Sequence, residues 1–112
     1  MYKLIREKNC TTIRPDESTI ITNYITKSAN PNLSIVIAEI NGDHGEYIYH
    51  GGIQFFLVIG GEVEFIFEDI SVKLFEGDCI QIYNEWHRKI GYKAKIVIVS
   101  YPAFEHSLEE IR

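Results

Sequence analysis

Short apolar runs rich in Ile, Val, Phe and Tyr follow one another along the chain, and almost no segment shows the spacing of a helical stripe. The runs are LSIVIAEI (33–40), EYIYH (46–50), IQFFLVI (53–59), EVEFIFE (62–68), ISVKLFE (70–76), CIQIYN (79–84), HRKIGY (87–92) and KIVIVSY (95–101). An earlier run, TIITNYI (19–25), fits either a strand or one helical turn. Because β-branched and aromatic residues favour strands, the pattern predicts an all-β protein.

Turn residues separate these runs at roughly the eight-to-twelve-residue spacing of a sandwich or barrel. They are Asn41-Gly42-Asp43, Gly51-Gly52, Gly60-Gly61, Glu68-Asp69 and Glu76-Gly77-Asp78. Glycine tolerates the positive φ of a tight turn, so Gly60-Gly61 is expected to join two strands in a hairpin. Pro102 should end the last strand, and the residues after it leave room for a short terminal helical turn.

The expected strands at residues 53–59 and 95–101 are apolar on both faces. One face can line a barrel interior, and the other face then needs a second sheet or a second subunit to cover it. We therefore expect a homodimer. With 112 residues and 46% apolar content, the chain suits one packed domain over residues 1–112, without linkers, repeats or low-complexity segments.

The formal net charge of −5 repels phosphate backbones, so no nucleic-acid partner is expected. The best basic cluster comprises Arg88, Lys89, Lys93 and Lys95. Such a cluster is typical of a solvated hairpin, although it could attract an anionic small molecule. No run approaches the roughly 18 apolar residues of a membrane span, and the N-terminus has no apolar signal region. We expect no membrane partner, a cytoplasmic location, and reduced thiols at Cys10 and at a buried Cys79.

Two stretches of the sequence resemble the two motifs of the cupin superfamily. The first, HGGIQFFLVIGGEVEF, runs from His50 to Phe65, and the second, GDCIQIYNEWH, runs from Gly77 to His87. The first cupin motif has a His-x-His pair, then a Glu and a closing Gly, and the second has Gly-Asp, a strand, a turn with Pro, and His. The resemblance, which extends to small stand-alone cupins, implies a double-stranded β-helix or jelly-roll barrel around a ligand cavity. It places the motifs at about residues 48–62 and 77–88 of a single cupin domain.

Carried over by position, the resemblance makes His50, Gln54 and His87 the candidate metal ligands, and the two histidines are also candidate catalytic residues. Ile48 stands where the first cupin histidine would be, Gln54 stands where the glutamate would be, and the turn YNEW lacks the proline. The implied cofactor is a divalent transition metal such as Zn, Fe, Mn or Ni. Because an amide lacks the carboxylate charge, Gln54 should leave this metal weakly held or absent.

The other two histidines, His44 and His106, are weaker candidates for a functional role. His44 lies in the loop candidate NGDHGE and is either a surface histidine or, if that loop folds back, a replacement for the missing ligand. His106 lies in the polar tail and is expected to be structural or solvent-facing. His50 and His87 could instead make a metal-free polar contact in the cavity.

Aromatic residues beside the candidate ligands are expected to line the pocket, although core packing explains most of them equally well. The ligand-pocket candidates are Tyr49, Phe56 and Trp86, with Trp86 at the cavity mouth. Tyr83 is a candidate catalytic proton donor, and Tyr47 lies nearby in the sequence. Glu85 is a turn glutamate of the kind that is usually solvated.

Three functions are compatible with these residues. The first is binding of a small polar ligand, such as a carbohydrate derivative or an organic acid, with or without a divalent metal acting as a Lewis acid in an oxygenase or isomerase. The second is a metal-free isomerase or epimerase, with a histidine as base and Tyr83 or Tyr49 as proton donor. The third is a non-catalytic sensing or binding module.

Overall fold

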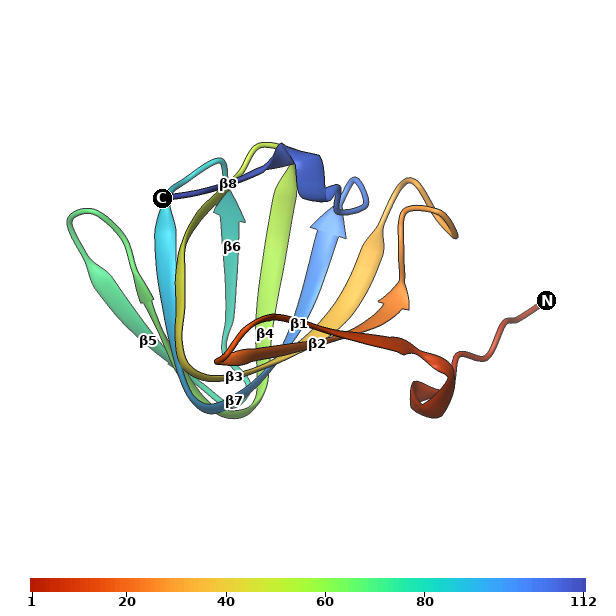
Figure 1. Cartoon of the computed structure of the whole chain (residues 1–112), viewed down its shortest axis with the longest axis horizontal. Coiled ribbons are helices and arrows are strands. Elements are labelled where there is room, and N and C mark those ends of the chain that lie inside the picture. The colour runs from red at the N-terminus through yellow and green to blue at the C-terminus, as the bar shows by residue number, and fades with distance from the viewer.

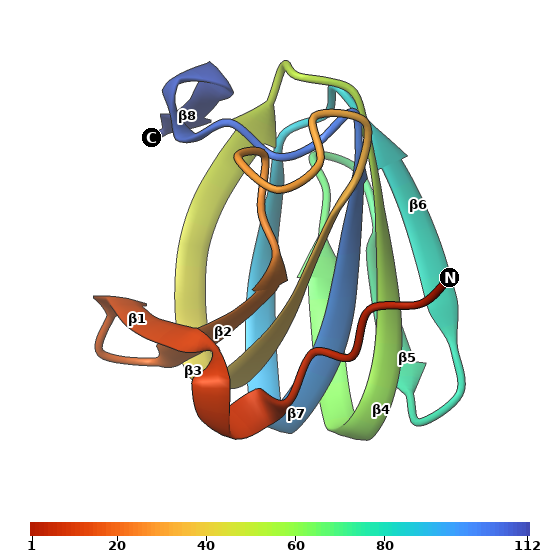
Figure 2. The ribbon, with the colours of Figure 1, turned by 90° about the vertical axis from the view of Figure 1, so that its right-hand side faces the viewer.

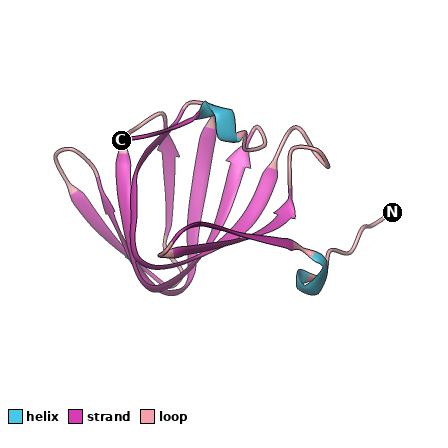
Figure 3. Ribbon diagram, in the orientation of Figure 1, coloured by secondary structure: helices cyan, strands magenta, loops and turns pink.

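The protein consists almost entirely of β-strands, as the sequence predicts (Figure 3). A computed structural model describes all residues from 1 to 112. The strands are β1 (Thr11–Asp16), β2 (Thr19–Ile25), β3 (Ser34–Tyr49), β4 (Ile53–Ile66), β5 (Ser71–Phe75), β6 (Cys79–Tyr83), β7 (His87–Tyr101) and β8 (Glu109–Ile111). The only helical segments are the 3-10 turns Glu7–Asn9 and His106–Leu108, and neither could span a bilayer.

Three long strands, β3, β4 and β7, bend in the middle and so take part in two sheets (Figure 1). Residues 34–40 of β3 pair with β2 on one side and with residues 94–100 of β7 on the other. Residues 53–58 of β4 then pair with β7, and β4 also pairs with β6. This first sheet therefore has the strand order β1-β2-β3-β7-β4-β6. The other halves of the long strands form the order β8-β3-β7-β4-β5. The two sheets face each other across a common interior (Figure 2), which confirms the predicted jelly-roll barrel.

Gly60 and Gly61 do not form the predicted hairpin. β4 runs through both glycines, and its two halves each pair with β7 rather than with each other. Gly61 has a φ of 65°, and a Cβ there would lie 2.1 Å from the carbonyl oxygen of Lys93. The glycine pair therefore bends a continuous strand from one sheet into the other, because positive φ and close backbone approach serve a bend as well as a turn.

The stretch NGDHGE is likewise part of a strand and not a loop. β3 continues through it from Ser34 to Tyr49, with a bend at Gly42, where φ is 119°. Opposite this bend, a Cβ at Gly91 of β7 would lie 2.3 Å from the carbonyl oxygen of Ile40. This close approach carries β3 into the second sheet and places His44 on it.

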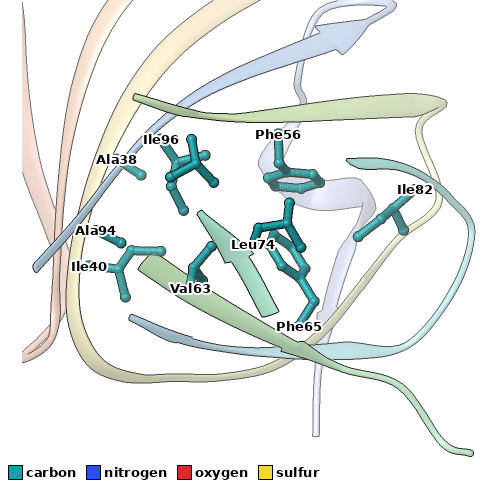
Figure 4. Close-up of a cluster of buried hydrophobic side chains, with 10 residues drawn as sticks. Ala38, Ile40, Phe56, Val63, Phe65, Leu74, Ile82, Ala94 and Ile96 are labelled. Atoms are coloured by element: carbon teal, nitrogen blue, oxygen red, sulfur yellow. The ribbon is translucent and has the colours of Figure 1, made fainter. Parts of the chain in front are cut away.

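Ten buried apolar side chains fill the space between the sheets (Figure 4). They are Ala38, Ile40, Phe56, Val58, Val63, Phe65, Leu74, Ile82, Ala94 and Ile96. Phe56 and Phe65 meet edge to face, with ring centroids 5.3 Å apart, the geometry that aromatic pairs favour. None of the ten comes from β1, β2 or β8, so this core does not fill the part of the interior that lies under these strands.

The outer face of the first sheet is apolar over several neighbouring strands. Two cross-strand rows run over it, formed by Leu57, Val97 and Ile37 and by Phe55, Val99 and Ile35. Cys79 of β6 pairs with Leu57 and is exposed rather than buried, because strand alternation points it outward while its neighbour Ile80 points inward. The interior and the exterior of this sheet are therefore both apolar, as the sequence predicts.

Candidate active site

A cavity of about 280 Å³ lies inside the barrel, beneath β1 and β2. Its wall comes from β1, β2, β3, β4, β7 and the C-terminal segment, and half of the lining residues are hydrophobic. Its polar lining includes His44, Tyr47, Gln54, Lys89 and Glu109. An apolar hollow with a few converging polar groups is the usual form of a small-molecule site, and this volume is near the lower end of the range, about 300 Å³.

His44 is held by a carboxylate from the first strand. Its Nδ1 lies 2.6 Å from Oδ2 of Asp16 and 2.7 Å from Oγ1 of Thr19. Burial raises the pKa of Asp16, but the hydrogen bonds that it accepts from Ser18 and His44 outweigh burial and leave that pKa below its usual value. An ionised carboxylate can only accept, so Nδ1 carries the proton and Nε2 bears the lone pair.

His44 lines the cavity, and the lone pair on its Nε2 is free. This nitrogen has no hydrogen-bond partner within the protein, and it is not sealed from solvent. Burial, followed by the positive charge of Lys89, lowers the pKa of His44, and the bond to Asp16 offsets only part of this effect. His44 is therefore a neutral imidazole with a fixed tautomer, which is the form that a general base needs.

Lys89 is a buried amine in the cavity wall, with only 5% of its surface exposed. None of the six ion pairs in the structure includes it. Its Nζ lies 5.1 Å from the ring centre of Phe56 and 5.6 Å from that of Tyr47. Burial lowers the pKa of Lys89 to about 8, and the negative charges of Glu109 and Asp16 oppose that change only in part.

His87 sits below Lys89 in the core and does not line the cavity. Its Nδ1 lies 3.0 Å from the backbone carbonyl of Glu85, which can only accept, so Nδ1 carries the proton. Nε2 then accepts a hydrogen bond from Nζ of Lys89 at 3.0 Å. Burial, with a smaller contribution from the charge of Lys89, lowers the pKa of His87 to about 3. A neutral His87 thus positions Lys89 without neutralising its charge.

Gln54, Tyr47 and Glu109 complete the polar lining. The amide nitrogen of Gln54 donates to Oγ of Ser100 at 3.1 Å, which leaves its oxygen free to accept from a ligand. Tyr47 stacks on His44 with ring centroids 4.7 Å apart, and its hydroxyl has no protein partner. Burial raises the pKa of Glu109, against the opposing charge of Lys89. Groups with pKa values moved in different directions therefore meet in one hollow, as they do in many active sites.

The structure does not bring His50 together with Gln54 and His87. The imidazole of His50 is at the surface, where Nδ1 lies 2.8 Å from Oδ1 of Asn84 and Nε2 lies 2.8 Å from Oε1 of Glu110. His50 belongs to the connection between β3 and β4, and Gly52, with a φ of 145°, turns the chain before Gln54 begins to face inward. Strand alternation from residue 50 to residue 54 is broken at that turn, which explains the difference from the expectation.

The residues present do not fit a metal ion at the expected position. Both ring nitrogens of His87 are engaged, by Glu85 and by Lys89, and the buried Lys89 amine stands where a metal would approach Nε2. No group of three or more His, Cys, Asp or Glu side chains is placed to hold a metal. Ile48, in the slot of the first cupin histidine, is buried and supplies no ligand.

Of the three predicted pocket residues, Phe56 lines the cavity and Tyr49 and Trp86 do not. Tyr49 stacks on Phe104 and accepts a hydrogen bond from the backbone of Glu105. Trp86 packs under the guanidinium of Arg112, whose central carbon lies 4.2 Å from the ring centroid. Tyr83 points outward and is 66% exposed, so it is not placed to donate a proton in the cavity. His106 was expected to be structural or solvent-facing, and it is exposed while also bordering the cavity.

Sequence reasoning missed Asp16, Lys89 and Glu109 as site residues. Lys89 in particular is not part of a solvated hairpin; it is buried, while Arg88, Lys93 and Lys95 are exposed. Its position two residues after His87 on one strand was the available signal, because such residues share a face. No comparable signal marked Glu109, which reaches the cavity from β8, or Asp16 of β1, which acts on the cavity through its hydrogen bond to His44.

Comparison with known sequences finds no matching family model and no matching curated protein. Solved structures do match. A variant of Streptomyces PAC13 with uridine superimposes with a TM-score of 0.86 at 16% identity, over 100% of this chain and 91% of that chain. KdgF from a Halomonas species matches with a TM-score of 0.81 at 13% identity, over 96% of this chain and 100% of that chain.

Oxalate decarboxylase from Bacillus subtilis, as a variant, matches with a TM-score of 0.78 at 14% identity. That match covers 100% of this chain and 33% of the larger one. All three neighbours have the cupin fold, so the structure confirms the cupin barrel that the two sequence motifs predict.

Proposed function

We propose that this protein binds a small polar molecule in the barrel cavity and transfers a proton on it, with His44 as the general base. The substrate class is a carbohydrate derivative or an organic acid. The reaction class is isomerisation or epimerisation, which begins when a proton leaves a carbon next to a carbonyl group. This is the metal-free alternative among the functions that the sequence allows.

The observation that carries the proposal is the hydrogen bond between Asp16 and His44. It fixes the imidazole in one tautomer, with the lone pair of Nε2 available to the cavity. A base oriented by a carboxylate is a recurrent catalytic arrangement, because the carboxylate also stabilises the imidazolium that forms when the base takes a proton. The lowered pKa of His44 keeps the base unprotonated at neutral pH.

Other cavity groups support the same chemistry. Removing a proton next to a carbonyl places negative charge on its oxygen, and the buried ammonium of Lys89 could stabilise that charge. A carboxyl group with a raised pKa retains its proton more readily, so Glu109 is suited to return a proton to the substrate. Tyr47 is a second candidate donor, and it replaces the exposed Tyr83 in this role.

The structural neighbours agree with a small polar ligand. PAC13 is described as a nucleoside dehydratase, and one of its variants was solved with uridine. A third neighbour is an oxalate decarboxylase. A cavity of about 280 Å³ with several hydrogen-bonding atoms suits molecules of this general kind.

The proposal is tested by solvent exchange. The protein is incubated in deuterium oxide with a panel of small sugars, sugar acids and oxo acids, and proton NMR follows the loss of signal next to the carbonyl group. We expect catalysed exchange into at least one compound. Replacing His44 by Gln should slow that exchange by about a hundredfold, the lower end of the usual effect of a general base.

The matched control is His50→Gln, because His50 lies outside the cavity and should leave the exchange rate unchanged. Asp16→Asn should reduce the rate and alter its dependence on pH, since an amide can stabilise the other tautomer of His44. Equal rates in His44→Gln and the unmodified protein would contradict the assignment. Absence of exchange across the whole panel would favour the non-catalytic binding module.

We also propose that two copies associate through the apolar outer face of the first sheet. The residues of this face are Ile35, Ile37, Phe55, Leu57, Val97 and Val99. Glu39 and Lys95 are neighbours on adjacent strands at the margin of this face. In a two-fold contact each of them could meet the opposite charge of the second copy. A second copy of the protein would cover this face with its own identical apolar face, so that both faces are removed from water.

Replacing Val97 by Glu should separate such a dimer, because the substitution puts a charge in the middle of the apolar face. Light scattering during size-exclusion chromatography would then report 13.0 kDa instead of twice that mass. Val72→Glu is the control, since Val72 is an exposed valine of β5 in the other sheet. An unmodified protein that elutes as a monomer at high concentration would contradict the proposal.

A further inference from the structure

We infer that Lys89 is a nucleophilic amine that forms an imine with an aldehyde or ketone bound in the cavity. The inference rests on the proposed function in one respect, because the proposed function places a carbonyl group on the molecule from which His44 removes a proton. It goes further by giving Lys89 a covalent role in place of an electrostatic one, because the iminium nitrogen, and not a separate ammonium group, then accommodates the charge that forms.

The position of Lys89 is unusual for a lysine. Lysine side chains ordinarily extend their ammonium group into water, or pair it with a carboxylate when they are buried. Lys89 does neither, because it is 5% exposed and makes no ion pair with a carboxylate. Its side chain nevertheless borders the cavity, so a bound molecule could reach the amine. Such an arrangement costs stability and points to a chemical use.

The partner of Lys89 suits a neutral amine. Nζ donates to Nε2 of His87 at 3.0 Å, and His87 is locked by Glu85 in the tautomer that accepts. A neutral amine still has two N–H groups, so it can keep this bond while its lone pair points elsewhere. A carboxylate in place of His87 would instead hold the group as an ammonium ion.

Titratable groups face Lys89 from several strands. His44 and Tyr47 lie on β3, His87 on β7 and Glu109 on β8, while Asp16 contributes from β1. Burial dominates over the two carboxylates and brings the pKa of Lys89 to about 8. A neutral amine is therefore more readily formed at Lys89 than at a solvated lysine.

The chemical step needs no oxidant or cofactor. The lone pair of Nζ attacks the carbonyl carbon, the amine nitrogen gives up its two protons, and the carbonyl oxygen takes up two protons and leaves as water. A carbon–nitrogen double bond replaces the carbon–oxygen double bond. Once protonated, this iminium withdraws electrons from the neighbouring carbon, so that His44 could remove a proton there. The two residues would then act on adjacent atoms of one molecule.

Reductive trapping tests the inference directly. The protein is treated at pH 7 with sodium cyanoborohydride and either dihydroxyacetone or pyruvate, which represent a neutral sugar derivative and an organic acid. Each trapped molecule adds its own mass less one oxygen atom. Peptide mapping by mass spectrometry should locate the adduct on Lys89, with at least tenfold higher occupancy than on any other lysine. Adducts that are spread evenly over the lysines, or absent from Lys89 with both compounds, would overturn the inference.

Two variants make the test specific. Lys89→Arg keeps the positive charge but should abolish trapping in the cavity, whereas Lys95→Arg on the outer face should leave it unchanged. His44→Gln separates this inference from the proposed function. Trapping that persists in His44→Gln while solvent exchange is lost supports both assignments. Exchange that depends on His44 without any trapping at Lys89 retains the proposed function and overturns the imine.

Discussion

Lowering the pH from about 7 to 3 should reduce the free energy of unfolding by about 4 kcal/mol through His87 alone. Burial and the charge of Lys89 lower the pKa of His87 from 6.5 to about 3 in the folded protein. Between these two values the unfolded chain binds a proton at this position and the folded protein does not. Stability is therefore fully present above pH 6.5 and is lost as the pH falls toward 3.

Urea denaturation at a series of pH values between 3 and 7 would measure this effect. His87→Gln should flatten the slope of stability against pH, because an amide does not titrate and can still accept from Lys89. Some slope should persist, since Asp16, Glu46 and Glu105 have lowered pKa values that act in the same direction. The surface variant His50→Gln should keep the full slope. Identical slopes for His87→Gln and the unmodified protein would contradict the role assigned to His87.

Raising the pH from about 8 to 10.5 should stabilise the protein by about 3 kcal/mol through Lys89. Burial lowers the pKa of Lys89 from 10.5 to about 8, so the folded protein releases this proton before the unfolded chain does. Below pH 8 both states hold the proton, and the cost of the buried charge is then constant. Because the pKa values of Tyr47 and Tyr49 are raised by burial, they oppose this gain at the upper end of the range.

Comparison with Lys89→Met isolates the contribution of the amine. Methionine removes the buried charge, worth about 3 kcal/mol below pH 8, and leaves Nε2 of His87 unpaired at a cost of about 1 kcal/mol. We expect a net gain near neutral pH of about 2 kcal/mol and no rise in stability between pH 8 and 10. Lys95→Met, at an exposed position, should change stability by less than about 0.5 kcal/mol. A Lys89→Met protein less stable than the original would contradict the cost assigned to the charge.

The strands could be predicted from the sequence because each apolar run must bury at least one face, whatever its partners are. The hairpin at Gly60-Gly61 could not, since turns and bends both use the positive φ of glycine. The structure has a bend and not a turn because both halves of β4 pair with β7. That pairing joins residues far apart in the sequence and is evident only from the complete fold. The same applies to NGDHGE, where the bend at Gly42 depends on the close approach of Gly91.

The site was predictable only where strand alternation was unbroken. Gln54 and Phe56, two residues apart on β4, both line the cavity. His50 does not, because Gly52 turns the chain between it and β4. Charged residues such as Lys89 are usually solvated, so their burial is evident only from the assembled barrel. The dimer and the cytoplasmic location stay predictions.

The last strand bears on how the protein is handled. β8 pairs with β3 through Tyr47 and Tyr49, brings Glu109 to the cavity wall, and is anchored by Arg112, which bonds to Glu46. A purification tag fused directly after Arg112 would compete with these anchors and could open the hollow, giving an inactive sample for reasons unrelated to its chemistry. The opposite end projects away from the barrel (Figure 1) and is the safer place for a tag or for immobilisation.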